Sequence, residues 1–126
     1  MERKIINTNE APAPIGPYSQ AVQAGNFLFV SGQVAINPST GNIEAKDIIE
    51  ETQQVMKNLT AILHEAQMDF NNVIKTTIFL SDMSLFTTVN EIYAGYFGGD
   101  FPARETVAVK GLPKNANVEI SIVASR

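Results

Sequence analysis

Cysteine is absent from the 126-residue chain, and histidine occurs only once, at position 64. Without cysteine the chain has no disulfide, no zinc–thiolate site and no cysteine nucleophile. His64 falls near Lys57 and Ala61 on the polar side of a predicted helix, a position typical of a solvated residue. A Ser-His-Asp triad and a histidine-bound metal are therefore not expected. Any catalysis would depend on arginine, carboxylate, hydroxyl and backbone groups.

Basic residues are also few, with 9 Lys and Arg against 13 Asp and Glu and a net charge of −4. They are scattered along the chain, so it lacks the basic stripe that nucleic-acid binding needs. No apolar run approaches the roughly 18 residues of a membrane span, and the first residues, MERKIINTNEAP, contain no signal-peptide core. We expect one cytoplasmic domain without nucleic-acid or membrane partners.

Hydrophobic periodicity predicts an α+β chain in the order β-β-β-α-β-α-β-β. The predicted strands cover residues 3–7, 19–25, 26–33, 72–80, 105–111 and 117–125. A long amphipathic helix begins at Asp47, where Glu50 three residues later resembles the capping-box pattern. A second helix is capped by Asp82 or Ser84 and is expected to end at Gly98-Gly99.

Two helices can cover only one face of a sheet of this size. Residues 27–30, Phe-Leu-Phe-Val, place large apolar side chains on both faces of their strand, because successive side chains alternate. Residues 73–80 do the same. The face without helices would be a large exposed apolar patch, so we expect it to contact another copy of the chain.

One cation and one anion lie near the two ends of the segment FPARETVAVKGLPKNANVEI, residues 101–120. Arg104 begins a strand and offers a bidentate fork for a carboxylate. Glu119 points away from the core face of its strand and could orient or deprotonate a water molecule. Each residue, taken alone, also fits an ordinary surface charge. We expect the hairpin through Pro113-Lys114 to make their strands neighbours.

Other polar residues fall at positions where a ligand or a structural partner is needed. Asn90 lies at the margin of the second helix's apolar arc, where its amide needs a partner such as a loop backbone. Tyr18, Ser31 and Gly32 belong to the segments GPYSQA and VSGQ. Gly32 either permits the close approach of a ligand or marks a bulge.

The segments IGPYSQA, FVSGQ, FPAR, LPK and VEI, in this order, resemble the RidA/YjgF family of enamine/imine deaminases along nearly the whole chain. The resemblance implies a single RidA-like domain over residues 1–126 and a Bacillus chorismate mutase-like fold. That fold is a mixed six-stranded sheet with two helices packed on one face. The resemblance also implies a homotrimer with sites in clefts between subunits, and neither a cofactor nor a metal.

The resemblance implies a role for each matching residue. Arg104 would bind the substrate carboxylate, and Glu119 would position the attacking water. Lining the pocket would be Tyr18, Ser31, Gly32, Asn90 and Thr106. Thr106 stands where many members have cysteine, and Glu105 stands where a small residue is common. Strand alternation should send Glu105 to the opposite face from Arg104.

The reaction implied is hydrolysis of 2-aminoacrylate, 2-aminocrotonate and their 2-imino acid tautomers to 2-oxo acids and ammonia. Such a protein would be a 2-iminobutanoate/2-iminopropanoate deaminase. One alternative is a non-catalytic trimer that binds small acids and regulates a partner, for which Glu119 would be of less use. Another is a translation-inhibiting ribonuclease, against which the acidic composition argues.

Overall fold

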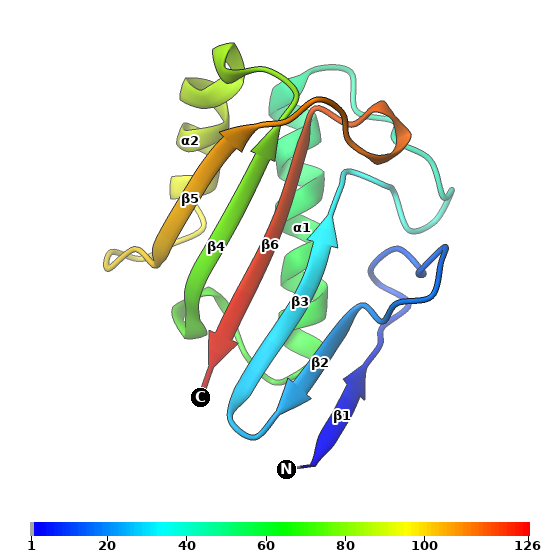
Figure 1. Cartoon of the computed structure of the whole chain (residues 1–126), viewed down its shortest axis with the longest axis vertical. Helices are drawn as coiled ribbons and strands as arrows, with labels where there is room; N and C mark the ends of the chain where they lie inside the picture. Colours follow the sequence, from blue (N-terminus) through cyan, green and yellow to red (C-terminus); the bar gives the residue numbers. More distant parts are fainter. Residues whose placement is uncertain (1) are drawn as a thin grey trace.

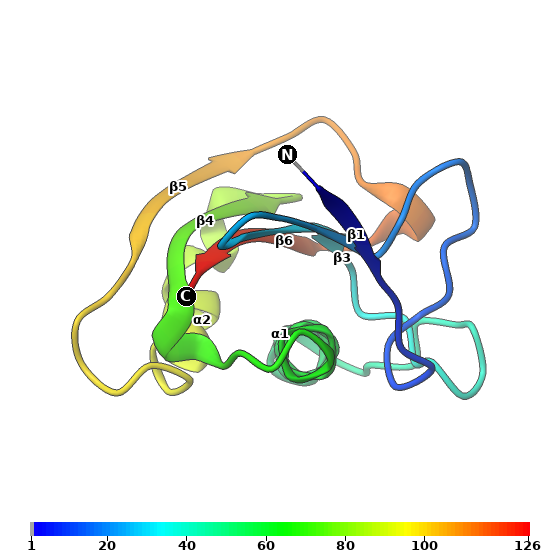
Figure 2. The same cartoon turned by 90° about the horizontal axis from the view of Figure 1, so that it is seen from below.

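The computed structural model describes residues 2–126 as a curved six-stranded sheet with two α-helices on one side (Figure 1). The strands are β1 (Arg3–Ile6), β2 (Ala21–Ala24), β3 (Phe27–Gln33), β4 (Val73–Leu80), β5 (Ala103–Ala108) and β6 (Val118–Ser125). The α-helices are α1 (Ile48–Glu65) and α2 (Phe86–Ala94). Figure 2 shows both helices beneath the same face of the sheet. The predicted order of elements and the α+β architecture are confirmed.

Helix α1 begins as the sequence predicts, with one difference at its cap. The Asp47 carboxylate accepts the backbone N–H of Glu50 at 2.8 Å. The Glu50 carboxylate accepts the N–H of Lys46 at 3.0 Å, rather than that of Asp47, so the capping box is displaced by one residue. The large apolar residues of α1 from Val55 to Leu63 are fully buried against the sheet, and His64 lies exposed on the other side. Within residues 2–126 no helix combines the length and apolar character needed to cross a membrane.

Helix α2 is shorter than the sequence predicts. It follows a 3₁₀ turn, η2 (Met83–Leu85), whose cap is the Asp82 carboxylate accepting the N–H of Ser84 at 2.8 Å. The helix ends at Ala94, with Gly95 as its cap, and not at Gly98-Gly99. Residues 95–97 continue as a tighter turn because the Phe97 ring still packs against Tyr93. The apolar side of α2 therefore continues to Phe97, beyond the last helical residue.

The strand order is β1-β2-β3-β6-β4-β5, and only β4 and β5 run parallel. The expectation that β5 and β6 are neighbours is wrong, because β4 lies between them. The connection over residues 109–117 straddles the end of β4. The N–H of Val109 donates to the Leu80 carbonyl, and the N–H of Ser81 donates to the Asn117 carbonyl, both at 2.9 Å. Each edge of β4 is thus paired, one with β5 and the other with β6.

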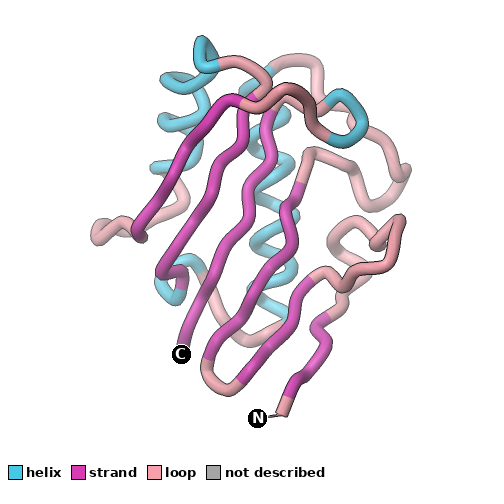
Figure 3. Tube along the Cα trace, in the orientation of Figure 1, coloured by secondary structure: helices cyan, strands magenta, loops and turns pink. Residues whose placement is uncertain are grey.

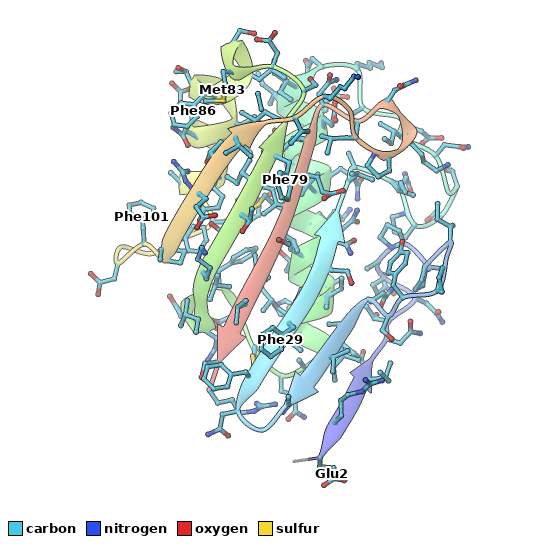
Figure 4. The ribbon with its side chains drawn as sticks, in the orientation of Figure 1. Glu2, Phe29, Phe79, Met83, Phe86 and Phe101 are labelled. Carbon is cyan, nitrogen blue, oxygen red and sulfur yellow. The ribbon has the colours of Figure 1, made fainter. Side chains whose placement is uncertain are left out.

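The two faces of the sheet differ in what covers them. We call the side packed on α1 and α2 the helix face, and the opposite side the open face. Apolar side chains on the open face remain about half exposed: Ile5, Phe27, Phe29 and Val107 have relative exposures of 48%, 45%, 49% and 46%. Figure 4 shows Phe29 and Phe79 projecting from this face. Strands that are apolar on both faces are therefore present, as the sequence predicts.

Candidate active site

Arg104 lies on the helix face, at the start of the edge strand β5 and opposite Thr76 of β4. Its Nη1 donates a hydrogen bond of 2.6 Å to Oδ1 of Asn90 in α2. Its guanidinium carbon lies 5.2 Å from the ring centre of Tyr93 and 5.7 Å from that of Phe86. Asn90 thus has a side-chain partner instead of a loop backbone. No carboxylate among residues 2–126 forms an ion pair with Arg104.

A cavity of about 350 Å³ opens beside the guanidinium. It is lined by Asn90, Tyr93, Ala94, Phe101, Pro102 and Arg104. The Phe101 ring is 61% exposed and lies where the chain enters β5, as Figure 4 shows. An available cation beside a largely apolar wall can receive a small acid with an apolar side chain. We call Arg104, Asn90, Phe86, Tyr93 and this cavity the arginine half-site.

Glu119 lies on the open face, on β6 and opposite Phe79 of β4. Its carboxylate rests against Gly32, so a Cβ added to Gly32 would lie 2.6 Å from Oε2 of Glu119. The β3–β6 register shifts between Val30 and Gln33, so Gly32 does belong to a bulge. The group that closely approaches Gly32 is the Glu119 carboxylate and not a ligand. Partial burial raises the pKa of Glu119 above its ordinary value.

Tyr18 and Ser31 lie on the same side of the sheet as Glu119. Ser31 ties the bulge to the loop before β2, because its Oγ donates to the Ser19 carbonyl at 2.6 Å. Its N–H donates to the Gln20 carbonyl at 2.9 Å. Tyr18 is 50% exposed and borders a cavity of about 430 Å³ together with Ser31 and Phe29. We call Glu119, Gly32, Ser31 and Tyr18 the glutamate half-site.

The loop over residues 7–20 is held in place by one buried side chain. Gln20 is 1% exposed, and its Nε2 donates to the carbonyls of Thr8 and Pro12, both at 2.9 Å. Its Oε1 accepts the N–H of Thr8 at 2.7 Å. Figure 3 shows this loop folding back beside the start of β2. Gln20 therefore fixes the segment that presents Tyr18, a role that no spacing pattern in the sequence indicated.

A second buried polar residue fixes the start of β6. Glu51 of α1 is 5% exposed, and its carboxylate accepts the N–H of Asn117 at 2.6 Å and the N–H of Val118 at 3.3 Å. It also accepts a hydrogen bond from Nδ2 of Asn117 at 3.0 Å. These bonds hold the backbone of the two residues that precede Glu119. The sequence did not mark Glu51, because a glutamate in the first turn of a helix is ordinary.

Thr106 and Glu105, the two departures from the family pattern, lie on opposite faces. Glu105 is on the open face, as strand alternation predicts, and its Oε1 accepts a hydrogen bond from Nζ of Lys75 at 3.1 Å. It therefore does not compete for Arg104 within the chain. Thr106 is on the helix face, and its buried hydroxyl has no hydrogen-bond partner among residues 2–126. Also within residues 2–126, no cluster of three His, Asp or Glu side chains could hold a metal ion.

The two half-sites of one chain are well separated. Arg104 is opposite Thr76 and Glu119 is opposite Phe79, with β4 between their strands. Strand spacing and rise place them about 10 Å apart across the sheet and about 10 Å apart along it. They also project from opposite faces. One chain therefore cannot bring Arg104 and Glu119 to the same small molecule.

Comparison with known proteins gives close relatives over the whole fold. The family model described as endoribonuclease L-PSP matches residues 8–126. A mouse protein named 2-iminobutanoate/2-iminopropanoate deaminase is 52% identical over 122 residues, which cover 97% of this chain and 90% of that protein. The structure of the Rid family protein YyfA from Yersinia pestis has a TM-score of 0.96 at 46% identity, over 99% of this chain and 100% of that one.

A further solved structure, E. coli TdcF with bound serine, has a TM-score of 0.93 at 39% identity. The match covers 98% of this chain and 98% of that one. Both the family model and the mouse relative extend over nearly all of the residues in which the motifs lie. The chain belongs to the endoribonuclease L-PSP family, which is the RidA/YjgF family that its motifs resemble.

Proposed function

We propose that the protein is a 2-iminobutanoate/2-iminopropanoate deaminase. It would hydrolyse 2-imino acids, formed from 2-aminoacrylate and 2-aminocrotonate, to 2-oxo acids and ammonia. The observation that carries this proposal is the Arg104 guanidinium, which is held at a cavity by uncharged partners and pairs with no carboxylate of residues 2–126. The name of the mouse relative, at 52% identity, supports the same reaction.

Arg104 would bind the substrate through its carboxylate. A guanidinium has five N–H donors in one plane, and a carboxylate can accept two of them side by side. Asn90 uses one donor of Nη1, and the remaining donors are available for the ligand. Serine, the ligand in the E. coli TdcF structure, is itself an α-amino acid with such a carboxylate. Capture of this group would orient the imine carbon toward the attacking water.

Glu119 would act on the water. An ionised carboxylate can accept a proton from water as the oxygen attacks C2 of the imine, which gives a carbinolamine. Glu119 returns this proton to the nitrogen to complete the carbinolamine. It then carries the hydroxyl proton to the nitrogen as the C–N bond breaks, and a 2-oxo acid and ammonia leave. The burial that raises the pKa of Glu119 makes it a stronger base than an exposed glutamate. Tyr18, Ser31, Gly32, Asn90 and Thr106 would shape the pocket around these steps.

The active unit would be a homotrimer, with each site shared by two subunits. Arg104 and Glu119 project from opposite faces of one sheet, so a site that uses both needs two copies of the chain. The half-exposed apolar residues of the open face, including Phe29 and Val107, supply a surface for such a contact. The arginine half-site of one subunit would then face the glutamate half-site of the next.

The reaction is tested by coupling the protein to a threonine or serine dehydratase and following 2-oxo acid formation in a weakly nucleophilic buffer. We expect the protein to accelerate release of the oxo acid, and Arg104→Ala to abolish most of that acceleration. An unchanged rate with the parent protein would contradict the proposal. Binding of 2-oxobutanoate without any acceleration would instead identify a small-acid sensor.

The shared site is tested by mixing two impaired variants. Arg104→Ala keeps Glu119, and Glu119→Gln keeps Arg104, so a reassembled mixture contains some interfaces with both native residues. Random assembly of equal amounts predicts about a quarter of the parent activity. The control mixes Arg104→Ala with the double variant, which yields no complete interface. Failure of the first mixture to recover activity, once light scattering shows mixed oligomers, would contradict the shared site.

A further inference from the structure

Within residues 2–126, the hydrogen-bond and aromatic partners of the Arg104 guanidinium are three uncharged side chains. Asn90 accepts from Nη1 at 2.6 Å, and the rings of Tyr93 and Phe86 lie 5.2 and 5.7 Å from the guanidinium carbon. Aromatic rings attract a guanidinium through its flat faces, whereas hydrogen bonds use donors in its plane. The rings therefore restrict the orientation of Arg104 without occupying the donors that a carboxylate needs.

Uncharged neighbours have a second consequence for binding. A protein carboxylate in place of Asn90 would hold Arg104 as firmly, but it would also compete with an incoming acid for the same charge. Because Asn90, Phe86 and Tyr93 carry no charge, the full positive charge stays available. This distinguishes Arg104 from Lys75, which is paired with Glu105 at 3.1 Å.

Tyr93 is the neighbour that is itself most firmly held. It is 3% exposed, and its hydroxyl lies 2.8 Å from Oγ1 of Thr76, which is 1% exposed. Thr76 is also the residue of β4 that stands opposite Arg104. A closed set of contacts thus runs from β4 through α2 to β5. Burial raises the pKa of the Tyr93 hydroxyl, against the smaller opposing effects of Thr76 and the Arg104 charge, so the phenol stays neutral.

We propose that Tyr93, fixed by Thr76, is a positioning residue that orients Arg104 for the substrate carboxylate. The inference rests on the proposed carboxylate-binding function of Arg104. Tyr93 acts through the face of the guanidinium, and Thr76 acts through the Tyr93 hydroxyl. Neither residue needs to touch the reacting atoms.

The test compares Tyr93→Leu with a matched control, Phe97→Leu. Phe97 packs on Tyr93 with ring centres 4.8 Å apart. The two rings belong to one aromatic cluster, which also contains Phe70 and Phe101. The Arg104 guanidinium has Phe86 and Tyr93 as its aromatic partners, not Phe97. Both substitutions should lower the melting temperature, since both remove an aromatic side chain from the cluster.

Carboxylate affinity should separate the two variants. By calorimetric titration with 2-oxobutanoate in a carboxylate-free buffer, Tyr93→Leu should raise Kd by about tenfold, and Phe97→Leu by less than about twofold. KM in the coupled assay should follow the same order, with a smaller change in kcat. Equal Kd values for Tyr93→Leu and the parent, or equal increases for Tyr93→Leu and Phe97→Leu, would overturn the proposal.

Two milder variants keep the test decisive if Tyr93→Leu does not fold. Tyr93→Phe keeps the ring but loses the hydroxyl, and Thr76→Val keeps the shape of Thr76 but loses its hydrogen bond to Tyr93. Each should raise Kd by about threefold, and the double variant should show no further increase, because both remove the same bond. Parent-like Kd values for both would overturn the proposal. A parent protein that neither binds 2-oxobutanoate nor turns over imines would instead contradict the proposed function.

Discussion

The two half-sites hold opposite charges by opposite means. Arg104 is held by side chains of a helix, through two aromatic rings and one amide, and its charge is left available. Glu119 is instead given room by the backbone, because Gly32 in the β3 bulge leaves space for its carboxylate. Neighbouring side chains orient Arg104, whereas Glu119 fits only because Gly32 has no side chain. The arginine half-site should therefore tolerate changes of shape poorly, and the glutamate half-site should tolerate added volume poorly.

Removal of each charged group is expected to give the largest effects, and of different kinds. Arg104→Ala should lower kcat/KM by about 10³-fold and abolish 2-oxobutanoate binding, because the carboxylate loses its partner. Glu119→Gln should lower kcat by about 10²-fold with nearly unchanged Kd, since it removes a base and not a binding group. Steady-state kinetics and calorimetry measure both. Equal changes in the Kd for 2-oxobutanoate in the two variants would contradict these separate roles of Arg104 and Glu119.

Arg104→Lys is the matched control for the arginine half-site. It keeps the positive charge but loses the planar fork and the flat faces that contact Phe86 and Tyr93. We expect activity between that of Arg104→Ala and the parent. Parent-like activity would mean that charge alone, and not orientation, matters at this position.

Added volume in the glutamate half-site should have the next largest effect. Gly32→Ala places a Cβ 2.6 Å from Oε2 of Glu119, so the carboxylate must move. We expect kcat to fall by about 30-fold with Kd for 2-oxobutanoate unchanged, because a displaced base no longer meets the water correctly. Gly111→Ala is the control, since its Cβ would meet nothing within 4 Å. Comparable activity of the two alanine variants would contradict the role of Gly32.

The sequence predicted most of the elements but not how the strands are arranged. Periodicity identifies α1 and the strands because burial imposes it residue by residue. Strand order depends on pairing between distant segments, and a short connection between β5 and β6 favoured the wrong neighbour. The structure resolves this through Ser81 and Asn117, whose backbone bond pairs the end of β4 with β6. For the same reason the sequence indicated that Asn90 needs a partner, but could not name Arg104.

The same limit explains why the sequence predicted neighbouring strands for Arg104 and Glu119, whereas the structure separates them by β4. Each residue was proposed as a candidate from its position in a strand and from the family motifs. The alternation of Glu119 with the buried residues Val118 and Ile120 predicts its face correctly. The face of Arg104 follows instead from its pairing opposite Thr76, and local sequence pattern does not determine that register.

The uncharged surroundings of Arg104 can be altered by one isosteric change. Asn90→Asp places a carboxylate where Oδ1 now accepts from Nη1 at 2.6 Å. The new ion pair should leave the melting temperature unchanged or raise it, yet raise KM by about tenfold, because it competes with the substrate carboxylate. Asn90→Ala, the control, should raise KM less and lower the melting temperature. A parent-like KM for Asn90→Asp would show that the charge of Arg104 is not what binds the substrate.

The smallest expected effect is the pH dependence that Glu119 adds to stability. Because burial raises its pKa in the folded state, the folded protein keeps this proton to higher pH than the unfolded chain does. Stability is therefore lost as pH rises from the ordinary glutamate range through the folded-state pKa. Glu119→Gln should match the parent near pH ~4 and become slightly more stable by pH ~7, as denaturant titrations at several pH values would measure. A difference of the opposite sign would mean that a cation stabilises the carboxylate in the assembled protein, as Arg104 of a neighbouring subunit would.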